Sequence, residues 1–369
     1  MARISLTSQV FGEDEVAQAT EAIKSGWIGS GEKLEKFEKK IAEYVGADYA
    51  IAVNSGTAAI DSALRALEIR GMEVITSVSS QASIANAIIS SGNKVVFADV
   101  SRENFNINAS QIESLITKNT GAILPIHLYG IPAEMEKIMQ IASEHDILVI
   151  EKCTMGTKLK GKQVGTFGEA GCFSLNPFST ITTGEGGFIA TNNAKAVKKI
   201  DDIRNYGRDP TVTDYCYTEY GYNFKFTNLQ AAIGLAQLGK IDSFIKSRRE
   251  NAAYMSKLLK ESKEIQLPRE KNGEYCVFNA FPVLLRKEGI RDKLKSFLEK
   301  KNIGVGTFFK PICSQPYYEK MFAKSKEIYP NAEYVGNNGL IIPCNPSLTK
   351  EQMDYMAESI KDGINAPGK

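Results

Sequence analysis

The sequence is poor in the residues from which metal centres and disulfide frameworks are built. Its 369 residues include only two histidines, and its six cysteines are scattered without a Cys-x-x-Cys pair. Zinc sites and disulfide networks depend on closely spaced cysteines and histidines. We therefore expect neither a metal site nor disulfides, and we expect any acid–base chemistry to use lysine, carboxylates, tyrosine or a well-placed imidazole.

Long apolar runs and a strong net charge are also missing. No stretch approaches the roughly 18 uninterrupted apolar residues of a membrane span, and the N-terminal residues contain no apolar leader segment. The formal net charge is only +2, and lysines alternate with acids, as in Glu32–Lys40. We therefore expect a cytoplasmic protein with neither a membrane nor a nucleic acid as its partner.

The chain is long and apolar enough for two packed units, since 43% of its residues are hydrophobic. Between residues 49 and 191, runs rich in valine, isoleucine and leucine alternate with amphipathic helical segments. This pattern predicts an α/β fold with a mostly parallel central sheet covered on both faces. A long helix is expected over about 228–260, then strands near 277–285 and 305–309 and helices near 290–300 and 350–362. We predict a large domain over 1–240 and a smaller α+β C-terminal domain over 241–369.

Three segments are expected at the carboxyl edge of this sheet, where open parallel sheets bind ligands. SGTAA joins a strand to a helix at Ser55 and offers backbone N–H groups that suit an anion, although serine there is also an ordinary helix cap. VIEKCTM contributes Glu151, Lys152 and Met155, and CFSLNPFSTITTGEGG forms a third wall. Together they predict a ligand pocket with an anion site.

Six motifs follow one another along the chain. They are SGW at 25–27, VNSGTAA at 53–59, PIHLYG at 125–130, GKQVGTFGEAGCFS at 161–174, TTGEGG at 182–187 and GYNFKFTNLQAAIGLAQL at 221–238. In this order they resemble the DegT/DnrJ/EryC1/StrS family of sugar aminotransferases. The resemblance implies a fold-type I pyridoxal-phosphate (PLP) transferase of the aspartate aminotransferase type. It also implies a homodimer whose sites are shared between subunits, and nucleotide-linked keto-hexoses as ligands.

The resemblance assigns a cofactor-phosphate site that this chain retains. Its components are the backbone at Gly56 and Thr57, the hydroxyl of Ser174, and Asn223 of the partner subunit. We therefore expect a phosphate group to bind where these residues meet.

The resemblance also places two residues near the substrate, Trp27 after Ser-Gly and Lys310 in TFFKPICSQPYY. The alternative for Trp27 is a core or interface residue, and the alternative for Lys310 is a solvated or salt-bridged lysine. His127 and Glu185 also match family positions, and we expect structural roles for both.

Four positions around the pyridine ring of PLP depart from the family pattern. The Schiff-base lysine falls on Ser179, and the aspartate that pairs with the pyridine nitrogen falls on Lys152. The two residues that flank the ring fall on Gln81 and Met155. A serine hydroxyl can neither form an imine nor act as a base near neutral pH. An ammonium about 4 Å from a pyridinium would repel it by roughly 4 kcal/mol at an effective dielectric constant of about 20.

These departures leave three hypotheses. The first, which we favour, is a catalytically silent or repurposed member that binds a sugar nucleotide or another phosphorylated ligand without PLP chemistry. The second is an active transaminase or dehydratase that holds PLP or its amine form, PMP, noncovalently. The third is a subunit that pairs with an active paralog in a heterodimer and completes its partner's site through Asn223.

Overall fold

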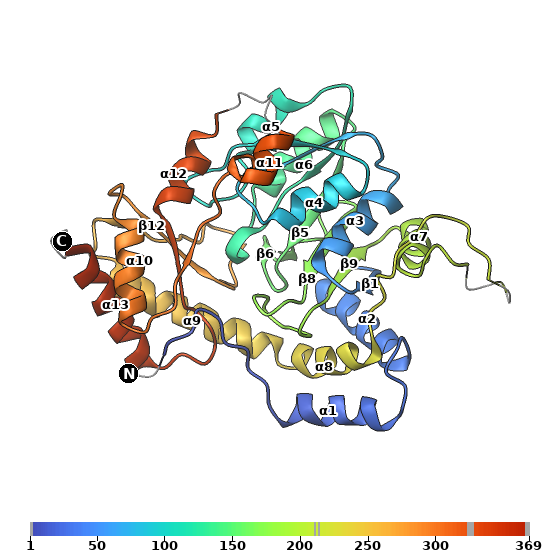
Figure 1. Cartoon of the computed structure of the whole chain (residues 1–369), viewed down its shortest axis with the longest axis horizontal. Helices are drawn as coiled ribbons and strands as arrows, with labels where there is room; N and C mark the ends of the chain where they lie inside the picture. The colour runs from blue at the N-terminus through green and yellow to red at the C-terminus, as the bar shows by residue number, and fades with distance from the viewer. Residues whose placement is uncertain (1–2, 210–211, 213–214, 323–327, 366–369) are drawn as a thin grey trace.

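The computed structural model describes residues 3–209, 212, 215–322 and 328–365, and its largest element is a seven-stranded sheet (Figure 1). The strand order is β1-β9-β8-β5-β4-β2-β3. These strands are β1 (Tyr49–Val53), β9 (Gly187–Thr191), β8 (Ala170–Ser174), β5 (Leu148–Cys153), β4 (Thr120–Leu124), β2 (Glu73–Ser77) and β3 (Lys94–Ala98). Only β9 runs antiparallel to its neighbours, β1 and β8. The predicted α/β fold with a mostly parallel sheet is confirmed.

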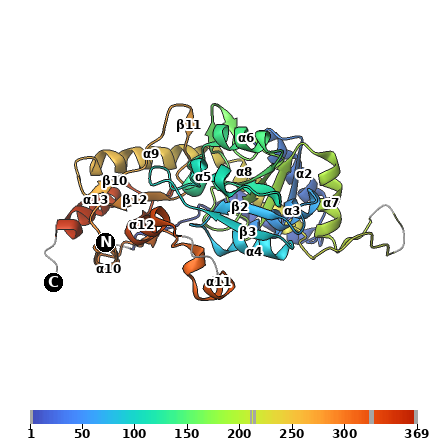
Figure 2. The ribbon, with the colours of Figure 1, turned by 90° about the horizontal axis from the view of Figure 1, so that it is seen from above.

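Helices cover both faces of this sheet, as the apolar strands require. On one face the core includes side chains of α3 (Gly56–Ala66), α4 (Ala82–Ser90) and α7 (Ala194–Arg204). On the other face, α5 (Ala109–Leu115) and α6 (Met135–Glu144) pack beside β2 to β5, and α2 (Glu32–Val45) packs beside β1, β8 and β9. Figure 2 shows α4 and α6 on opposite sides of β2 and β3. α1 (Glu13–Lys24) lies against α8 (Asn228–Leu238).

A second, antiparallel sheet is formed by later residues in the order β10-β12-β14-β13. Its strands are β10 (Ile265–Gln266), β12 (Phe281–Leu285), β14 (Gly339–Ile342) and β13 (Gly306–Thr307), and it is accompanied by α10 (Arg291–Lys300), α11 (Pro316–Met321), α12 (Pro330–Asn338) and α13 (Lys350–Asn365). A small sheet joins β11 (Glu274–Tyr275), β6 (Lys158–Leu159) and β7 (Lys162–Gln163). The domain boundary at residue 240 stays a prediction.

The single helix predicted over 228–260 is wrong, because the chain forms two helices there. α8 (Asn228–Leu238) begins with a capping box between Thr227 and Gln230, and α9 (Ile241–Leu259) follows after Gly239 and Lys240. Glycine is a poor helix former, and the ammonium of Lys240 pairs with buried Glu15 of α1. The interruption therefore coincides with a tertiary contact that helical periodicity does not encode.

The strands expected at 277–285 and 305–309 are shorter than predicted. β12 begins only at Phe281, after Phe278 adopts a left-handed conformation with φ of 49°, and β13 contains only two residues. Within the described residues, no helix is both long and apolar enough to cross a bilayer.

Candidate functional site

A cavity of about 350 Å³ lies where the carboxyl ends of β4, β5 and β8 approach the second sheet. Five residues singled out from the sequence line it, namely Gln81, Lys152, Met155, Ser174 and Ser179. Other lining residues include Asn176, Thr180, Asn279, Thr307 and Phe309, which the sequence interpretation did not select. The first two belong to the segment already expected to form a wall. Thr307 and Phe309 belong to the TFFKPICSQPYY segment that contains Lys310, whereas no local pattern signals Asn279.

Strand pairing sets the arrangement of the cavity floor. Lys152 on β5 is paired with Cys172 on β8, so their side chains share a face of the sheet. Ser174 lies two residues further along β8 and uses the same face, roughly 7 Å along the strand. Two hydrogen bonds hold the backbone of Lys152. Its N–H donates to the carbonyl of Pro125 at 2.8 Å, and its carbonyl accepts the N–H of His127 at 2.9 Å.

Lys152 is an amine without an acidic partner in this cavity. Within the described part of the chain, no aspartate, glutamate or arginine lines the cavity. The ammonium donates to the carbonyl oxygen of Cys153 at 3.3 Å. Burial removes the amine from water and lowers the pKa of Lys152, and it raises the pKa of the Cys172 thiol to about 12. The charged form of Lys152 is therefore poorly stabilised.

The anion site predicted from the sequence lies at the start of α3, and its ligand stays a prediction. Ser55 is the N-cap, and its hydroxyl accepts the N–H of Ala58 at 3.1 Å. A Cβ added to Gly56 would lie 2.9 Å from the Cβ and 3.2 Å from the hydroxyl of Ser174, so glycine lets the helix start approach that side chain. The first N–H groups of a helix have no intrahelical acceptor, and its dipole favours an anion. Gly56, Thr57 and Ser174 thus fit a phosphate.

Ser179 closes a tight turn after β8. Its hydroxyl donates to the side-chain oxygen of Asn176 at 3.0 Å, and its N–H donates to the Asn176 carbonyl at 3.0 Å. The backbone N–H of Phe178 donates to the same side-chain oxygen at 3.1 Å. This turn places a hydroxyl, not an amine, at the cavity wall.

The ring-flanking candidates differ in exposure. Met155 is buried, and its carbonyl accepts the hydroxyl of Thr180 at 3.1 Å. Gln81 is exposed and occupies the N-cap position of α4. Both residues line the cavity, but Met155 is part of the core whereas the side chain of Gln81 is exposed to solvent.

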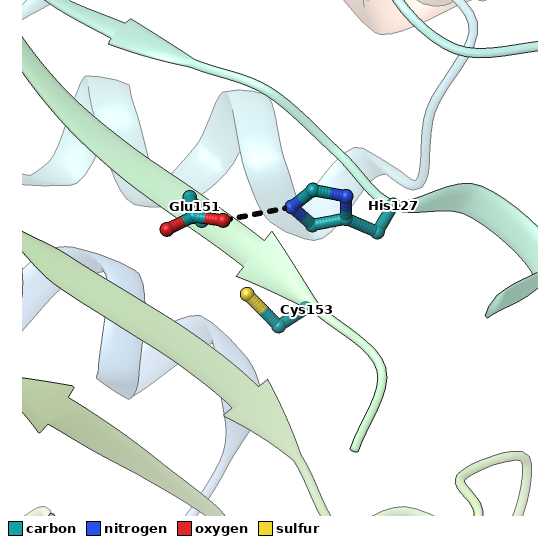
Figure 3. Close-up of side chains that lie close together, drawn as sticks. All are labelled: His127, Glu151 and Cys153. Carbon is teal, nitrogen blue, oxygen red and sulfur yellow. Dashed lines mark hydrogen bonds and ion pairs between the residues drawn. The ribbon is translucent and has the colours of Figure 1, made fainter. Parts of the chain in front are cut away.

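His127, Glu151 and Cys153 lie together at one side of the cavity, which His127 and Cys153 line, with potential ligand atoms within 4.8 Å of one another (Figure 3). The Nδ1 of His127 accepts the Ala133 N–H at 3.0 Å, so its Nε2–H donates to Glu151 at 3.0 Å. The Glu151 carboxylate also accepts backbone N–H groups of residues 165, 167 and 168 at 2.8, 2.8 and 3.0 Å. Since these groups are fully used, we interpret the cluster as a structural support.

Five candidates lie outside the lining of this cavity in a single chain, namely Gly56 and Thr57 at the start of α3, and Trp27, Lys310 and Asn223. Trp27 is 64% exposed, and its indole N–H donates to the Ser30 carbonyl at 2.7 Å. Lys310 is exposed, although Phe309 beside it lines the cavity. Asn223 is exposed, and its carbonyl accepts the Asn54 side-chain N–H at 3.0 Å. Their predicted roles in substrate and phosphate binding stay predictions.

Comparison with solved structures defines the class as fold-type I PLP-dependent transferases. DesV of S. venezuelae, solved in complex with a ketimine intermediate, superposes with a TM-score of 0.93 at 27% identity, covering all of both chains. The putative sugar aminotransferase Spr1654 of Streptococcus pneumoniae in its PLP form superposes with a TM-score of 0.92 at 21% identity, covering 98% of each chain, and supports the fold.

The chain belongs to the DegT/DnrJ/EryC1/StrS aminotransferase family, whose model matches residues 9–361. It is 37% identical over 352 residues to the GDP-perosamine synthase of Escherichia coli O157:H7, covering 94% of this chain and 95% of that protein. The family resemblance read from the sequence is confirmed. The fold neighbour Spr1654 has been solved in both PLP and PMP forms.

Proposed function

We propose that this chain binds a sugar nucleotide or another phosphorylated sugar in its cavity and does not carry out transamination through a PLP Schiff base. One observation carries the proposal: the amine that lines the cavity belongs to Lys152, at the position matched to the aspartate of the family, whereas Ser179 presents a hydroxyl at the lysine position. The residues fit the phosphate of PLP but not its aldehyde or its protonated ring.

The retained anion site supports a phosphorylated ligand. Gly56 and Ser174 are in contact at the start of α3, where backbone N–H groups and the helix dipole favour a phosphate. The name of the GDP-perosamine synthase relative points to nucleotide-linked sugars as the ligand class. A homodimer in which Asn223 of the partner subunit completes the site is part of this proposal.

Absorbance spectroscopy of the purified protein with added PLP tests the Schiff-base part. We expect no visible aldimine band, and no covalent adduct after borohydride reduction. The double variant K152D/S179K restores both family residues and should gain the band, because it supplies an amine for the aldehyde and an anion for the ring nitrogen. A reducible band in the unaltered protein, or turnover of a nucleotide-linked keto-sugar with glutamate, would contradict the proposal.

Thermal denaturation tests the ligand part. We expect GDP-linked, UDP-linked or dTDP-linked sugars to raise the melting temperature in a concentration-dependent way, because a ligand that binds only the folded state stabilises it. The matching free nucleosides, which lack phosphate, serve as controls. Equal melting temperatures with and without every phosphorylated ligand would contradict binding in this cavity.

A further inference from the structure

The amine of Lys152 is the feature of the cavity that its structural surroundings leave unexplained. Lysine side chains in proteins normally reach water or pair with carboxylates. Here the residue is half-buried, and the cavity it lines contains no acidic side chain within the described residues. The nearest carboxylate in sequence, Glu151, extends from the opposite face of β5 and is occupied by His127 and three backbone N–H groups.

The groups that face Lys152 do not stabilise its charge. Cys172 of β8 is paired with it and buried, and burial raises the pKa of that thiol, so it stays uncharged at neutral pH. Cys153, the next residue of β5, points to the opposite face of the sheet, and burial raises the pKa of its thiol well above the usual range. Desolvation lowers the pKa of Lys152 itself, which increases the fraction of neutral amine. A neutral amine in an apolar setting is a nucleophile toward carbonyl carbons.

The position of this amine relative to the anion site limits the ligand. Lys152 and Ser174 share one face of the sheet, on neighbouring strands and two residues apart in register. A ligand whose phosphate lies at Gly56 and Ser174 can therefore extend along the floor toward Lys152. Lys152 and Ser174 both belong to strands of the central sheet. Backbone hydrogen bonds of the N–H and the carbonyl of Lys152 fix its position.

We propose that Lys152 forms an imine with the aldehyde or ketone carbon of a phosphorylated sugar bound in this cavity. The inference rests on the proposed function for the placement of the phosphate. The nitrogen lone pair attacks the carbonyl carbon, and the carbonyl oxygen takes up one proton from the nitrogen to give a carbinolamine. A second proton from the nitrogen then reaches that oxygen, the C–O bond breaks to release water, and the C=N bond forms. Amine and carbonyl thus give imine and water, with no oxidant or reductant.

Reductive trapping tests the proposal on the full-length protein. D-erythrose 4-phosphate, an aldehyde that carries a phosphate at the other end of its carbon chain, is added with cyanoborohydride, and modified peptides are mapped by mass spectrometry. We expect modification of Lys152 at least tenfold above that of exposed Lys118. D-erythrose, which lacks the phosphate, should modify both lysines equally.

Two variants separate covalent chemistry from charge. K152M and K152R should both lose the trapped adduct, whereas the K118M control should retain the adduct at Lys152. The K152R variant keeps a positive charge but cannot form the imine, and its circular dichroism and melting curve report whether it is folded.

Absence of a Lys152 adduct in the unaltered protein, or equal labelling with and without the phosphate, would overturn the proposal. If phosphorylated sugars still raise the melting temperature in that case, the proposed binding function stands and only the imine is lost. If neither trapping nor stabilisation occurs, both proposals fail.

Discussion

At the scale of single residues, Lys152 lowers the stability of the fold and at the same time supplies the cavity with a nucleophilic amine. Its amine is withdrawn from water without a carboxylate in the cavity to compensate, so the folded state holds the charged form less well than the unfolded state does. Stability is often sacrificed in this way at functional positions. Ser179, in contrast, is fully engaged in a turn with Asn176 and carries no comparable cost.

Replacing Lys152 by methionine should therefore stabilise the fold. Burial lowers the pKa of Lys152 from 10.5, so the folded chain releases this proton at a lower pH than the unfolded chain. Stability is lowest below the folded pKa and rises as pH increases through it toward 10.5. We expect K152M to raise the free energy of unfolding at neutral pH by about 1 kcal/mol and to lose this rise with pH.

Urea denaturation at several pH values measures both effects, with the K118M variant on the exposed surface as the control. A K152M variant less stable than the unaltered protein at neutral pH would show that the amine is already compensated.

At the scale of elements, the site depends on the contact between the start of α3 and the end of β8. Gly56 permits this contact, because any side chain there would meet Ser174 at less than normal van der Waals distance. β8 in turn is held between β5 and β9 in the sheet. The anion site is therefore a product of helix-on-strand packing and not of the S-G-T turn alone.

The G56A variant tests this dependence. The added methyl group must push α3 away from Ser174, so we expect at least a tenfold loss in affinity for a GDP-linked sugar, measured by isothermal titration calorimetry. The G29A variant is a matched control, since a Cβ at Gly29 would have no neighbour within 4 Å. Unchanged affinity in G56A would place the phosphate elsewhere.

At the scale of the whole molecule, one surface carries an unusual number of exposed aromatic rings. The segment that follows α7 extends away from the body in both overall views (Figure 1, Figure 2). Within it, Tyr206, Tyr215, Tyr217 and Tyr220 are 48%, 78%, 59% and 68% exposed. Exposed apolar surface of this kind is typical of protein interfaces. It suits the proposed homodimer, since Asn223 belongs to the same segment.

The Y217D variant should weaken that homodimer, because it places a charge among aromatic rings that association would bury. We expect sedimentation velocity to show a dimer for the unaltered protein and a shift toward monomer, by at least tenfold in dissociation constant, for Y217D. The Y317D variant on α11 alters an equally exposed tyrosine and serves as the control. A monomeric unaltered protein would contradict the proposed shared site.

Local sequence patterns predicted the elements that carry the site. The alternation of apolar runs and helical periodicity correctly predicted the α/β class and the mostly parallel sheet, and ordered motifs identified the family. The serine and lysine at positions 179 and 152 are also visible in the sequence alone. The break after α8 was missed, because the contact of Lys240 with Glu15 joins residues far apart in the chain.

Properties that depend on long-range packing were decided only by the tertiary structure. The sequence determined that position 152 is a lysine. Strand register and the walls contributed by the second sheet placed its amine in the same cavity as Ser174, and among the described residues no carboxylate lines that cavity. The same packing left Trp27, Asn223 and Lys310 outside that cavity. The physical reason is that periodicity reports which face of an element is buried, whereas the electrostatic state of a side chain depends on every group packed around it.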